Sequence, residues 1–294
     1  MTPMPSQAPI QLTSVADIIT WKQGLRKGYT IGFVPTMGAL HEGHLALVQS
    51  AMQRCDVVVA SIYVNPTQFN LSADFSAYPS DVDGDIAMLH SIGCHAVFLP
   101  ETDLLYPHGV TPDHFDLAGL DSLLEGAHRP GHFQGVATVV NRLFDLLMPD
   151  KAFFGLKDFQ QVKVVQRLAA IRESNPEIIP CPIVREPSGL AMSSRNRRLT
   201  RNQCADASVI FIALQAIADS QGSLSPVEIQ SQMTAAIQAS GTLIVEAIDV
   251  VSADDLTCPD PLISLRNQGK KVQVMVSAFA GEVRLIDNLT VYRG

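Results

Sequence analysis

The chain has 294 residues, of which 47% are hydrophobic, so it can bury a large core and is not a mainly disordered protein. The length suggests two domains. The formal net charge of −8 comes without a long basic run, which argues against a nucleic-acid partner. We therefore expect small-molecule ligands, and an anionic ligand must meet a local positive charge.

The cysteines and the N-terminal segment predict a cytoplasmic protein without a membrane segment. The five cysteines form no C-x-x-C pair, and their odd number fits a reducing compartment better than a disulfide framework. Residues 1–10 lack the basic and apolar regions of a signal peptide, and no apolar run approaches membrane-spanning length.

Apolar strand-like runs alternate with helical patterns from about residue 30 to residue 184. The runs are 31–34, 57–64, 96–99, 152–154 and 178–184. This alternation predicts an α/β fold, with a Rossmann-like parallel sheet and crossover helices. Between Gly135 and Met148 the apolar residues are three and four positions apart, which predicts a helix that Pro149 closes.

The composition changes after the turn-like segment 185–189 (REPSG). Helical patterns cover about 201–220 and 226–240, and strand-like runs follow at 243–251, 272–279 and 283–292. The last two runs surround Gly281-Glu282, as the strands of a hairpin would. We predict a Rossmann-like ligand-binding domain at 1–184 and a smaller α+β C-terminal lid domain at 185–294.

Residues 35–44 (PTMGALHEGH) lie between a buried run and a helical pattern. A helix start exposes unpaired N–H groups and the positive end of the macrodipole, and His41 and His44 add two imidazoles there. The segment predicts a polyphosphate site, with ATP as the first ligand to test. A zinc site is disfavoured because no third ligand stands at suitable spacing, and two ordinary polar turn residues remain an alternative.

The loops that follow three of the predicted strands carry polar side chains. Because the carboxyl ends of parallel strands meet at one edge of a sheet, these loops should share one crevice. The side chains are His41 and His44, then Asn65 and Gln68, then Lys157 and Asp158.

A second segment, 190–196 (LAMSSRN), offers Ser193, Ser194 and Arg195 in succession. Two hydroxyls and a guanidinium suit the oxygens of the β- and γ-phosphates. The alternative is a helix N-cap followed by solvated charge. Together with the histidine segment, the phosphate interpretation is favoured, and we predict that both segments close around the same triphosphate.

Six segments, spread in order over nearly the whole chain, resemble the pantothenate synthetases, which belong to the nucleotidyltransferase superfamily with an H-x-G-H motif. They are 36–44 (TMGALHEGH), 63–69 (YVNPTQF), 131–136 (GHFQGV), 154–161 (FGLKDFQQ), 192–196 (MSSRN) and 284–288 (RLIDN). The resemblance implies a ligase that condenses (R)-pantoate with β-alanine through pantoyl adenylate, releasing AMP and pyrophosphate. It also implies Mg²⁺ with the ATP, a homodimer, and binding of nucleotide and pantoate by the domain at 1–184.

By this resemblance His44 donates a proton, His41 lies beside it on the phosphates, and Lys157 and Arg195 complete the catalytic set. Gln68 and Gln161 would bind pantoate. The ATP-binding set would be Met37, Gly38, Ala39, Leu40, His41, Glu42, Gly43, His44, Gly155, Leu156, Lys157, Asp158, Val184, Met192, Ser193, Ser194 and Arg195. Within it, Asp158 would contact the ribose, and Gly155 and Val184 would hold adenosine through their backbone.

Three features leave alternatives open. Met37 and Phe69 either line the pocket for the gem-dimethyl group or pack in the core. The metal ligands are unknown: Asp81, Asp83 and Asp85 are candidates, but capping of a helix by Ser80 with Asp83 is favoured. The segment 125–132 is interpreted as a mobile loop over the site or as a dimer contact.

Two other functions would use some of the same groups. A nucleotidyltransferase that leaves AMP or CMP on its product would use the same phosphate segments, but the neutral amides Gln68 and Gln161 argue against a second phosphate. A non-catalytic nucleotide sensor does not need a complete set of groups directed at a leaving pyrophosphate.

Overall fold

The computed structural model describes residues 8–70, 75–172 and 176–293. The chain divides into two compact units, residues 1–182 and residues 183–294. Residues 1–7, which belong to the N-terminal segment without signal-peptide features, lie outside the described residues.

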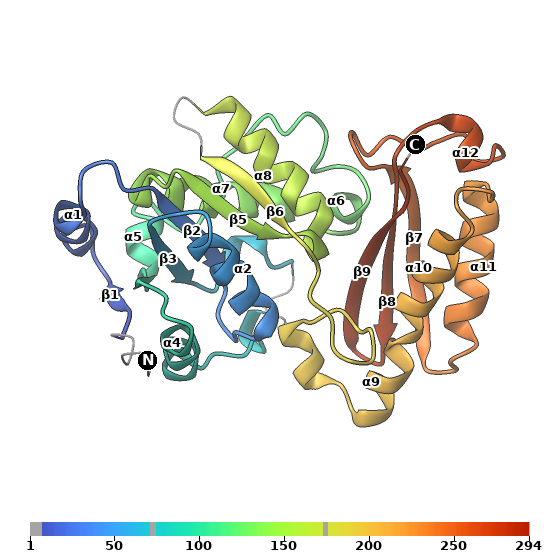
Figure 1. Ribbon diagram of the computed structural model, residues 1–294, viewed down its shortest axis with the longest axis horizontal. Helices are drawn as coiled ribbons and strands as arrows, with labels where there is room; N and C mark the ends of the chain where they lie inside the picture. The colour runs from blue at the N-terminus through green and yellow to red at the C-terminus, as the bar shows by residue number, and fades with distance from the viewer. Residues whose placement is uncertain (1–7, 71–74, 173–175, 294) are drawn as a thin grey trace. The chain divides into compact units, whose positions relative to one another are not determined.

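The first unit is built on six parallel strands in the order β1-β4-β3-β2-β5-β6 (Figure 1). The predicted α/β fold is thereby confirmed. β1 was not predicted and pairs with β4 at the edge of the sheet. The strands are β1 Ile10–Leu12, β2 Ile31–Thr36, β3 Val57–Ile62, β4 Ala96–Phe98, β5 Lys151–Gly155 and β6 Glu177–Cys181.

Helices cover both faces of this sheet, because successive strand residues point to opposite sides. Phe33 joins a core cluster with α1, α7 and α8, whereas Val34 joins a second cluster with α2 and α4. The helices are α1 Val15–Gly24, α2 Glu42–Met52, α4 Val82–Ser91, α5 Thr102–Leu105, α6 Glu125–His128, α7 His132–Leu147 and α8 Phe159–Ile171. The predicted helix at 135–148 is α7, which starts earlier, at His132, and ends where Met148 turns to a φ of 44°.

The order of the strands changes direction at β2. From β2 the chain adds β3 and then β4 on one side, and it later adds β5 on the other side. The connections that leave β2 and β5 therefore diverge at neighbouring strand ends, since α2 covers one face of the sheet and α8 the other. In open α/β sheets this is where ligands bind.

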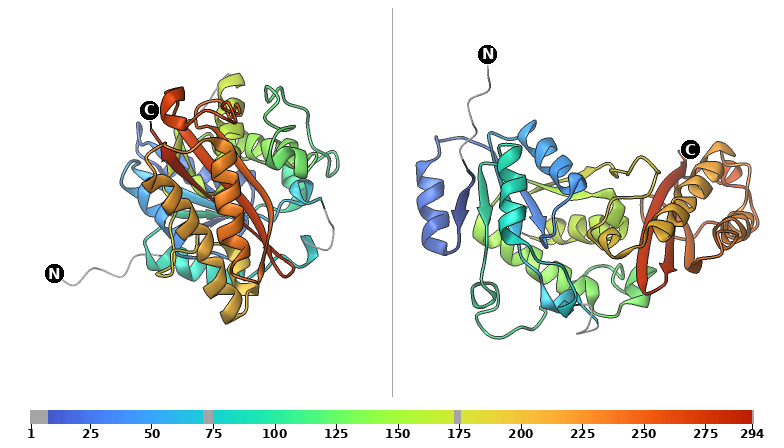
Figure 2. Two further views of the ribbon diagram at one scale, coloured as in Figure 1. Left: turned by 90° about the vertical axis from the view of Figure 1, so that its right-hand side faces the viewer. Right: turned by 90° about the horizontal axis from the view of Figure 1, so that it is seen from below.

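The second unit is a three-stranded antiparallel sheet in the order β7-β8-β9, covered on one face by α10 and α11 (Figure 2). Gly281, with a φ of 62°, and Glu282 form the predicted hairpin turn between Ala280 and Val283. The elements are α9 Arg201–Ala207, α10 Val209–Asp219, α11 Pro226–Gln238, β7 Leu243–Ser252, α12 Leu265–Gln268, β8 Val272–Ala280 and β9 Val283–Tyr292. The predicted helix at 201–220 is interrupted at Ser208, whose hydroxyl donates to the Ala205 carbonyl at 2.6 Å.

All five cysteines are free thiols. Burial raises the pKa of the Cys94 thiol to about 11, so this residue packs as a small apolar side chain. No helix within the described ranges combines the length and the apolar character that crossing a membrane requires.

Candidate active site

The connection between β2 and α2 adopts an uncommon backbone conformation. Gly38 has a φ of 79° and Ala39 a φ of 51°, so two successive residues lie in the left-handed region. A Cβ atom at Gly38 would lie 2.9 Å from Oδ2 of Asp85 and 3.1 Å from Cγ2 of Ile62. The loop therefore needs glycine at this position, for both its conformation and its close contacts.

A buried carboxylate on α4 holds this loop. Asp85 is 3% exposed, and its two oxygens accept the N–H groups of Ala39 at 2.8 Å and Leu40 at 2.7 Å. Charge-assisted bonds of this kind offset the cost of the left-handed backbone. Asp85, a candidate metal ligand by sequence, is thus engaged with the backbone. The predicted cap is also corrected: Asp81, not Ser80, caps α4, accepting the Gly84 N–H at 3.0 Å.

Two imidazoles cap the start of α2. Nδ1 of His41 accepts the Gly43 N–H at 3.1 Å, and Nδ1 of His44 accepts the His41 N–H at 3.3 Å. This reciprocal arrangement is the one that Ser or Thr usually forms with Glu or Gln. The two ring centroids are 4.1 Å apart. Because both Nδ1 atoms accept, a neutral ring carries its proton on Nε2, which can donate to a ligand at the positive end of the helix.

The turn after β3 meets the loop after β2 at Gln68, the last residue of η1 Pro66–Gln68. Oε1 of Gln68 accepts from Nδ2 of Asn65 at 3.1 Å, and its Nε2 lies 3.0 Å from the Met37 sulfur. α7 packs directly on this turn: a Cβ atom at Gly135 would lie 2.2 Å from the Thr67 carbonyl oxygen. Gly135 is therefore needed for this close approach.

The segment 125–132 forms the short helix α6 and then contacts the same turn. Arg129 donates through Nη2 to the Gln68 carbonyl at 3.1 Å, and Nδ1 of His132 lies 2.8 Å from that oxygen. Nη1 of Arg129 also lies 3.3 Å from both Nε2 of His132 and a carboxylate oxygen of Glu125. This segment, interpreted from sequence as a loop over the site or a dimer contact, thus supports the backbone of Gln68.

His132 provides a pH prediction. Burial, with Arg129 beside it, lowers the pKa of His132 to about 4, so the neutral ring donates from Nδ1 to Gln68 and accepts at Nε2 from Arg129. The unfolded chain binds this proton first as the pH falls. The free energy of unfolding should therefore drop by about 3 kcal/mol between about pH 6.5 and pH 4.

Urea unfolding across this pH range measures the effect. In His132→Asn, which keeps an N–H donor, this component of the pH dependence should be lost. The exposed His114 supplies the control His114→Gln, which should retain it. The same pH dependence in His132→Asn as in the unchanged protein would contradict the assignment.

The chain leaving β5 enters η2 Leu156–Asp158 and then α8. Lys157 is half-buried in η2, Asp158 is exposed immediately before α8, and Gln161 is half-buried in the first turn of α8. The charge of Asp158 acts on the pKa of His132. Leu156, by contrast, packs against the apolar core.

In the second unit, residues 184–192 form a closed loop before the serine segment. The Met192 N–H donates to the Val184 carbonyl at 3.0 Å. Ser193 precedes η3 Ser194–Arg198 and accepts the Arg195 N–H at 3.3 Å, so it fills the capping role weighed as the alternative. Ser194 is buried and Arg195 is half-buried.

A bidentate ion pair that the sequence did not indicate fixes this loop to β9. Nη1 and Nη2 of Arg185 lie 2.6 and 2.9 Å from the two oxygens of Asp287, which is 4% exposed. The same guanidinium lies 3.8 Å from the ring centroid of Phe211. The segment 284–288 thus holds the base of the loop that leads to Ser193.

No group of three or more His, Cys, Asp or Glu side chains suited to a metal ion occurs in the described part of the chain.

Comparison with known proteins shows the family. The family described as pantoate-beta-alanine ligase matches residues 11–290. The pantothenate synthetase of Cytophaga hutchinsonii is 41% identical over 286 residues, which cover 96% of this chain and 99% of that protein. The pantothenate synthetase of Cereibacter sphaeroides is 44% identical, over 94% of this chain and 96% of that protein.

Solved structures of similar proteins indicate the same family. The pantothenate synthetase of Thermus thermophilus has a TM-score of 0.86 at 38% identity, covering 96% of this chain and 99% of that chain. A pantoate-beta-alanine ligase from Francisella tularensis, complexed with beta-gamma ATP and beta-alanine, has a TM-score of 0.79 at 33% identity. It covers 97% of this chain and 98% of its own. The resemblance seen in the six sequence segments is confirmed, and the chain belongs to the pantoate–β-alanine ligase, or pantothenate synthetase, family.

Proposed function

We propose that the chain carries out the ligation of its family in two steps, with pantoyl adenylate as the intermediate. In the first step a carboxylate oxygen of (R)-pantoate attacks the α-phosphorus of ATP, and the bond to the bridging oxygen breaks to release pyrophosphate. In the second step the amine of β-alanine attacks the acyl carbon, loses a proton, and displaces AMP. The histidine pair that caps α2 is the observation that carries this proposal.

Negative charge grows on the bridging oxygen and the departing pyrophosphate during the first step. The start of α2 and the Nε2 protons of His41 and His44 can stabilise that charge without reorganisation. We assign His44 as the proton donor and His41 to the phosphates. The pantoate carboxylate is already a nucleophile, so the step needs no general base.

The pantoate site is assigned to Gln68 and Gln161. Neutral amides bind hydroxyl and carboxylate oxygens without forming an ion pair that would weaken the nucleophile. Met37 contacts the Gln68 amide, which suits a residue lining the same pocket. Phe69 is half-buried and packs edge-on against Phe75 and Tyr78, with ring centroids 5.5 and 5.8 Å away.

Lys157 and the segment Ser193, Ser194 and Arg195 are assigned to the β- and γ-phosphates. Asp158 is assigned to the ribose, and the backbone at Gly155 and Val184 to adenosine. This assignment requires the second unit to act as a lid that brings Arg195 to the phosphates bound at α2. The Francisella tularensis relative complexed with beta-gamma ATP and beta-alanine supports ATP and β-alanine as ligands.

We propose that Mg²⁺ accompanies ATP and is held mainly by phosphate oxygens. The described residues offer no carboxylate cluster for it, and both Asp85 oxygens already accept backbone N–H groups. No step is assigned to the ion. We also propose a cytoplasmic homodimer: the free cysteines support the reducing compartment, and the family resemblance supports the dimer.

Exchange of labelled pyrophosphate into ATP tests the adenylate. Exchange should require pantoate and proceed without β-alanine, because adenylate formation is reversible before the amine arrives. β-Alanine alone should support no exchange. Exchange in the absence of pantoate, or none in its presence, would contradict the two-step pathway.

A further inference from the structure

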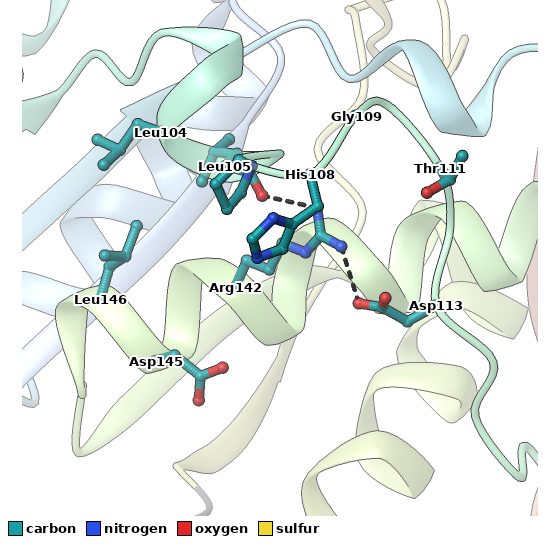
Figure 3. Close-up of a pocket in the computed structure, with 10 residues that line it drawn as sticks. Leu104, Leu105, His108, Gly109, Thr111, Asp113, Arg142, Asp145 and Leu146 are labelled. Carbon is teal, nitrogen blue, oxygen red and sulfur yellow. Dashed lines mark hydrogen bonds and ion pairs between the residues drawn. The ribbon is translucent and has the colours of Figure 1, made fainter.

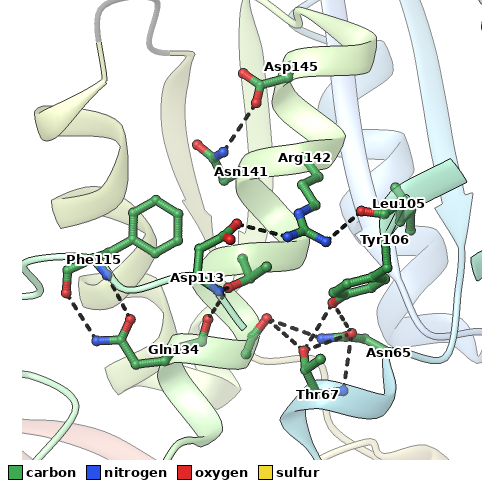
Figure 4. Close-up of polar contacts among 12 residues, drawn as sticks. Asn65, Thr67, Leu105, Tyr106, Asp113, Phe115, Gln134, Asn141, Arg142 and Asp145 are labelled. Carbon is green, nitrogen blue, oxygen red and sulfur yellow. Dashed lines mark hydrogen bonds and ion pairs between the residues drawn. The ribbon is translucent and has the colours of Figure 1, made fainter. Parts of the chain in front are cut away.

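Tyr106 contacts the turn that carries Gln68, a residue of the proposed pantoate site. It follows α5 and is 2% exposed. Its hydroxyl lies 2.5 Å from Oδ1 of Asn65 and 3.0 Å from Oγ1 of Thr67 (Figure 4). Tyr106 thus reaches the turn that ends at Gln68 from a separate part of the first unit.

The hydrogen bonds of Asn65 fix which way its amide faces. Asn65 is 1% exposed, and its Nδ2 donates to the Gly135 carbonyl at 3.2 Å. Its Oδ1 accepts from the hydroxyls of Tyr106 and Thr67. A carbonyl only accepts, so Nδ2 must face Gly135 and Oδ1 must face the hydroxyls.

The orientation of Asn65 in turn sets that of Gln68. Nδ2 of Asn65 can only donate, so Gln68 must turn Oε1 towards it, at 3.1 Å. Nε2 of Gln68 then faces the loop after β2, where it lies 3.0 Å from the Met37 sulfur. Gln68 consequently directs its N–H donors towards this loop, and N–H donors are what a carboxylate or hydroxyl oxygen of pantoate needs.

We infer that Tyr106 is a positioning residue for pantoate binding, acting through Asn65 on the amide of Gln68. This inference rests on the proposed function, which assigns Gln68 to pantoate. Thr67 belongs to the same turn as Gln68, so its bonds to Asn65 move with that turn. Tyr106 is the hydroxyl donor that ties Oδ1 of Asn65 to a different element.

The guanidinium of Arg142 stacks over the ring of Tyr106. Its guanidinium carbon lies 4.3 Å from the Tyr106 ring centroid, and it donates to the Leu105 carbonyl at 2.6 Å and pairs with Asp113 at 3.0 Å. Arg142 lines an outer pocket of about 340 Å³ (Figure 3). The ring is thus backed by a fixed cation. Burial also raises the pKa of Tyr106 to about 12, so the hydroxyl keeps its proton.

Tyr106→Phe removes only the hydroxyl. We expect the KM for pantoate to rise about tenfold, the size of effect expected when a buried acceptor loses its shortest hydrogen bond. The KM for ATP should be unchanged, a split that general loosening of the fold would not produce. Thr67→Val removes the other side-chain donor to Asn65 and, as a second variant, should act in the same direction.

Tyr63→Phe is the matched control. Tyr63 is 8% exposed, and its hydroxyl donates to Thr102 at 3.4 Å, not to Asn65. This variant should leave the KM for pantoate unchanged. A rise equal to that of Tyr106→Phe would show that loss of any buried hydroxyl suffices and would overturn the inference.

A double-mutant cycle with Gln68→Ala separates the action of Tyr106 from the role of Gln68 itself. Gln68→Ala should raise the KM for pantoate, and adding Tyr106→Phe should then have no further effect. If Tyr106→Phe has the same effect with Gln68 present and with Gln68→Ala, Tyr106 does not act through Gln68. That result would overturn the inference about Tyr106 and leave the assignment of Gln68 in place. An unchanged KM for pantoate in Gln68→Ala itself would instead overturn the assignment of Gln68 in the proposed function, and the inference with it.

Discussion

His44→Ala is expected to slow pantoyl adenylate formation by ~10²- to 10³-fold, the usual loss when one preorganised donor to a developing charge is removed. The imidazole accepts the His41 N–H through Nδ1, so the remaining ring proton on Nε2 is fixed in place before ATP binds. The rate of pantoate-dependent pyrophosphate exchange at saturating ATP measures this step.

His44→Gln separates catalysis from helix capping. Glutamine at the third helical position can still accept the backbone N–H of the cap residue, so α2 should begin at the same place, but the imidazole is absent. The rate should be as low as in His44→Ala. His114→Gln, at an exposed histidine elsewhere in the first unit, is the control and should exchange normally. A near-normal rate in His44→Gln would remove the imidazole from the mechanism.

The parts of the fold that could be predicted are those with a local pattern long enough to read. α7 has a continuous apolar face, and the buried strands β2 and β3 are mainly apolar, so this helix and these strands were predicted. β1 was missed because three residues, Ile10–Leu12, carry too little periodicity, and its strand character comes from pairing with β4. The break at Ser208 depends on a side-chain bond that helical periodicity does not record.

Residues of the candidate site also fall into two groups: those that a local sequence pattern predicts, and those that depend on contacts between distant parts of the chain. The histidine pair could be predicted because both rings act on the helix start that contains them. Asp85 binds backbone groups 45 and 46 residues away, and a single sequence does not show that such a contact forms. One signal was present: Asp85 stands four residues before the buried Leu89, so a carboxylate occupies the apolar face of α4. A carboxylate in that position indicates a buried partner, here a strained loop.

Asp287→Ala is expected to lower the free energy of unfolding of the second unit by about 3–5 kcal/mol, because it leaves a largely buried guanidinium without its partner. The Arg185 and Asp287 side chains are only 16% and 3% exposed. Glu246→Ala on the same sheet is the control. Its ion pair with Arg284 is more exposed, at 25% and 21%, and its removal should cost about 1 kcal/mol or less.

Asp287→Ala should also affect the proposed ATP site. Arg185 ties the closed loop 184–192 to β9, and Ser193 and Arg195 follow that loop directly. Loosening the loop should raise the KM for ATP, measured below the melting transition, while Glu246→Ala leaves it unchanged.

Replacing both partners, as Arg185→Met with Asp287→Leu, should restore much of the stability because no buried charge is left unpaired. It should not restore the KM for ATP, since the bidentate link to β9 remains absent. Equal, small stability losses in Asp287→Ala and Glu246→Ala would show that the buried pair does not anchor the loop.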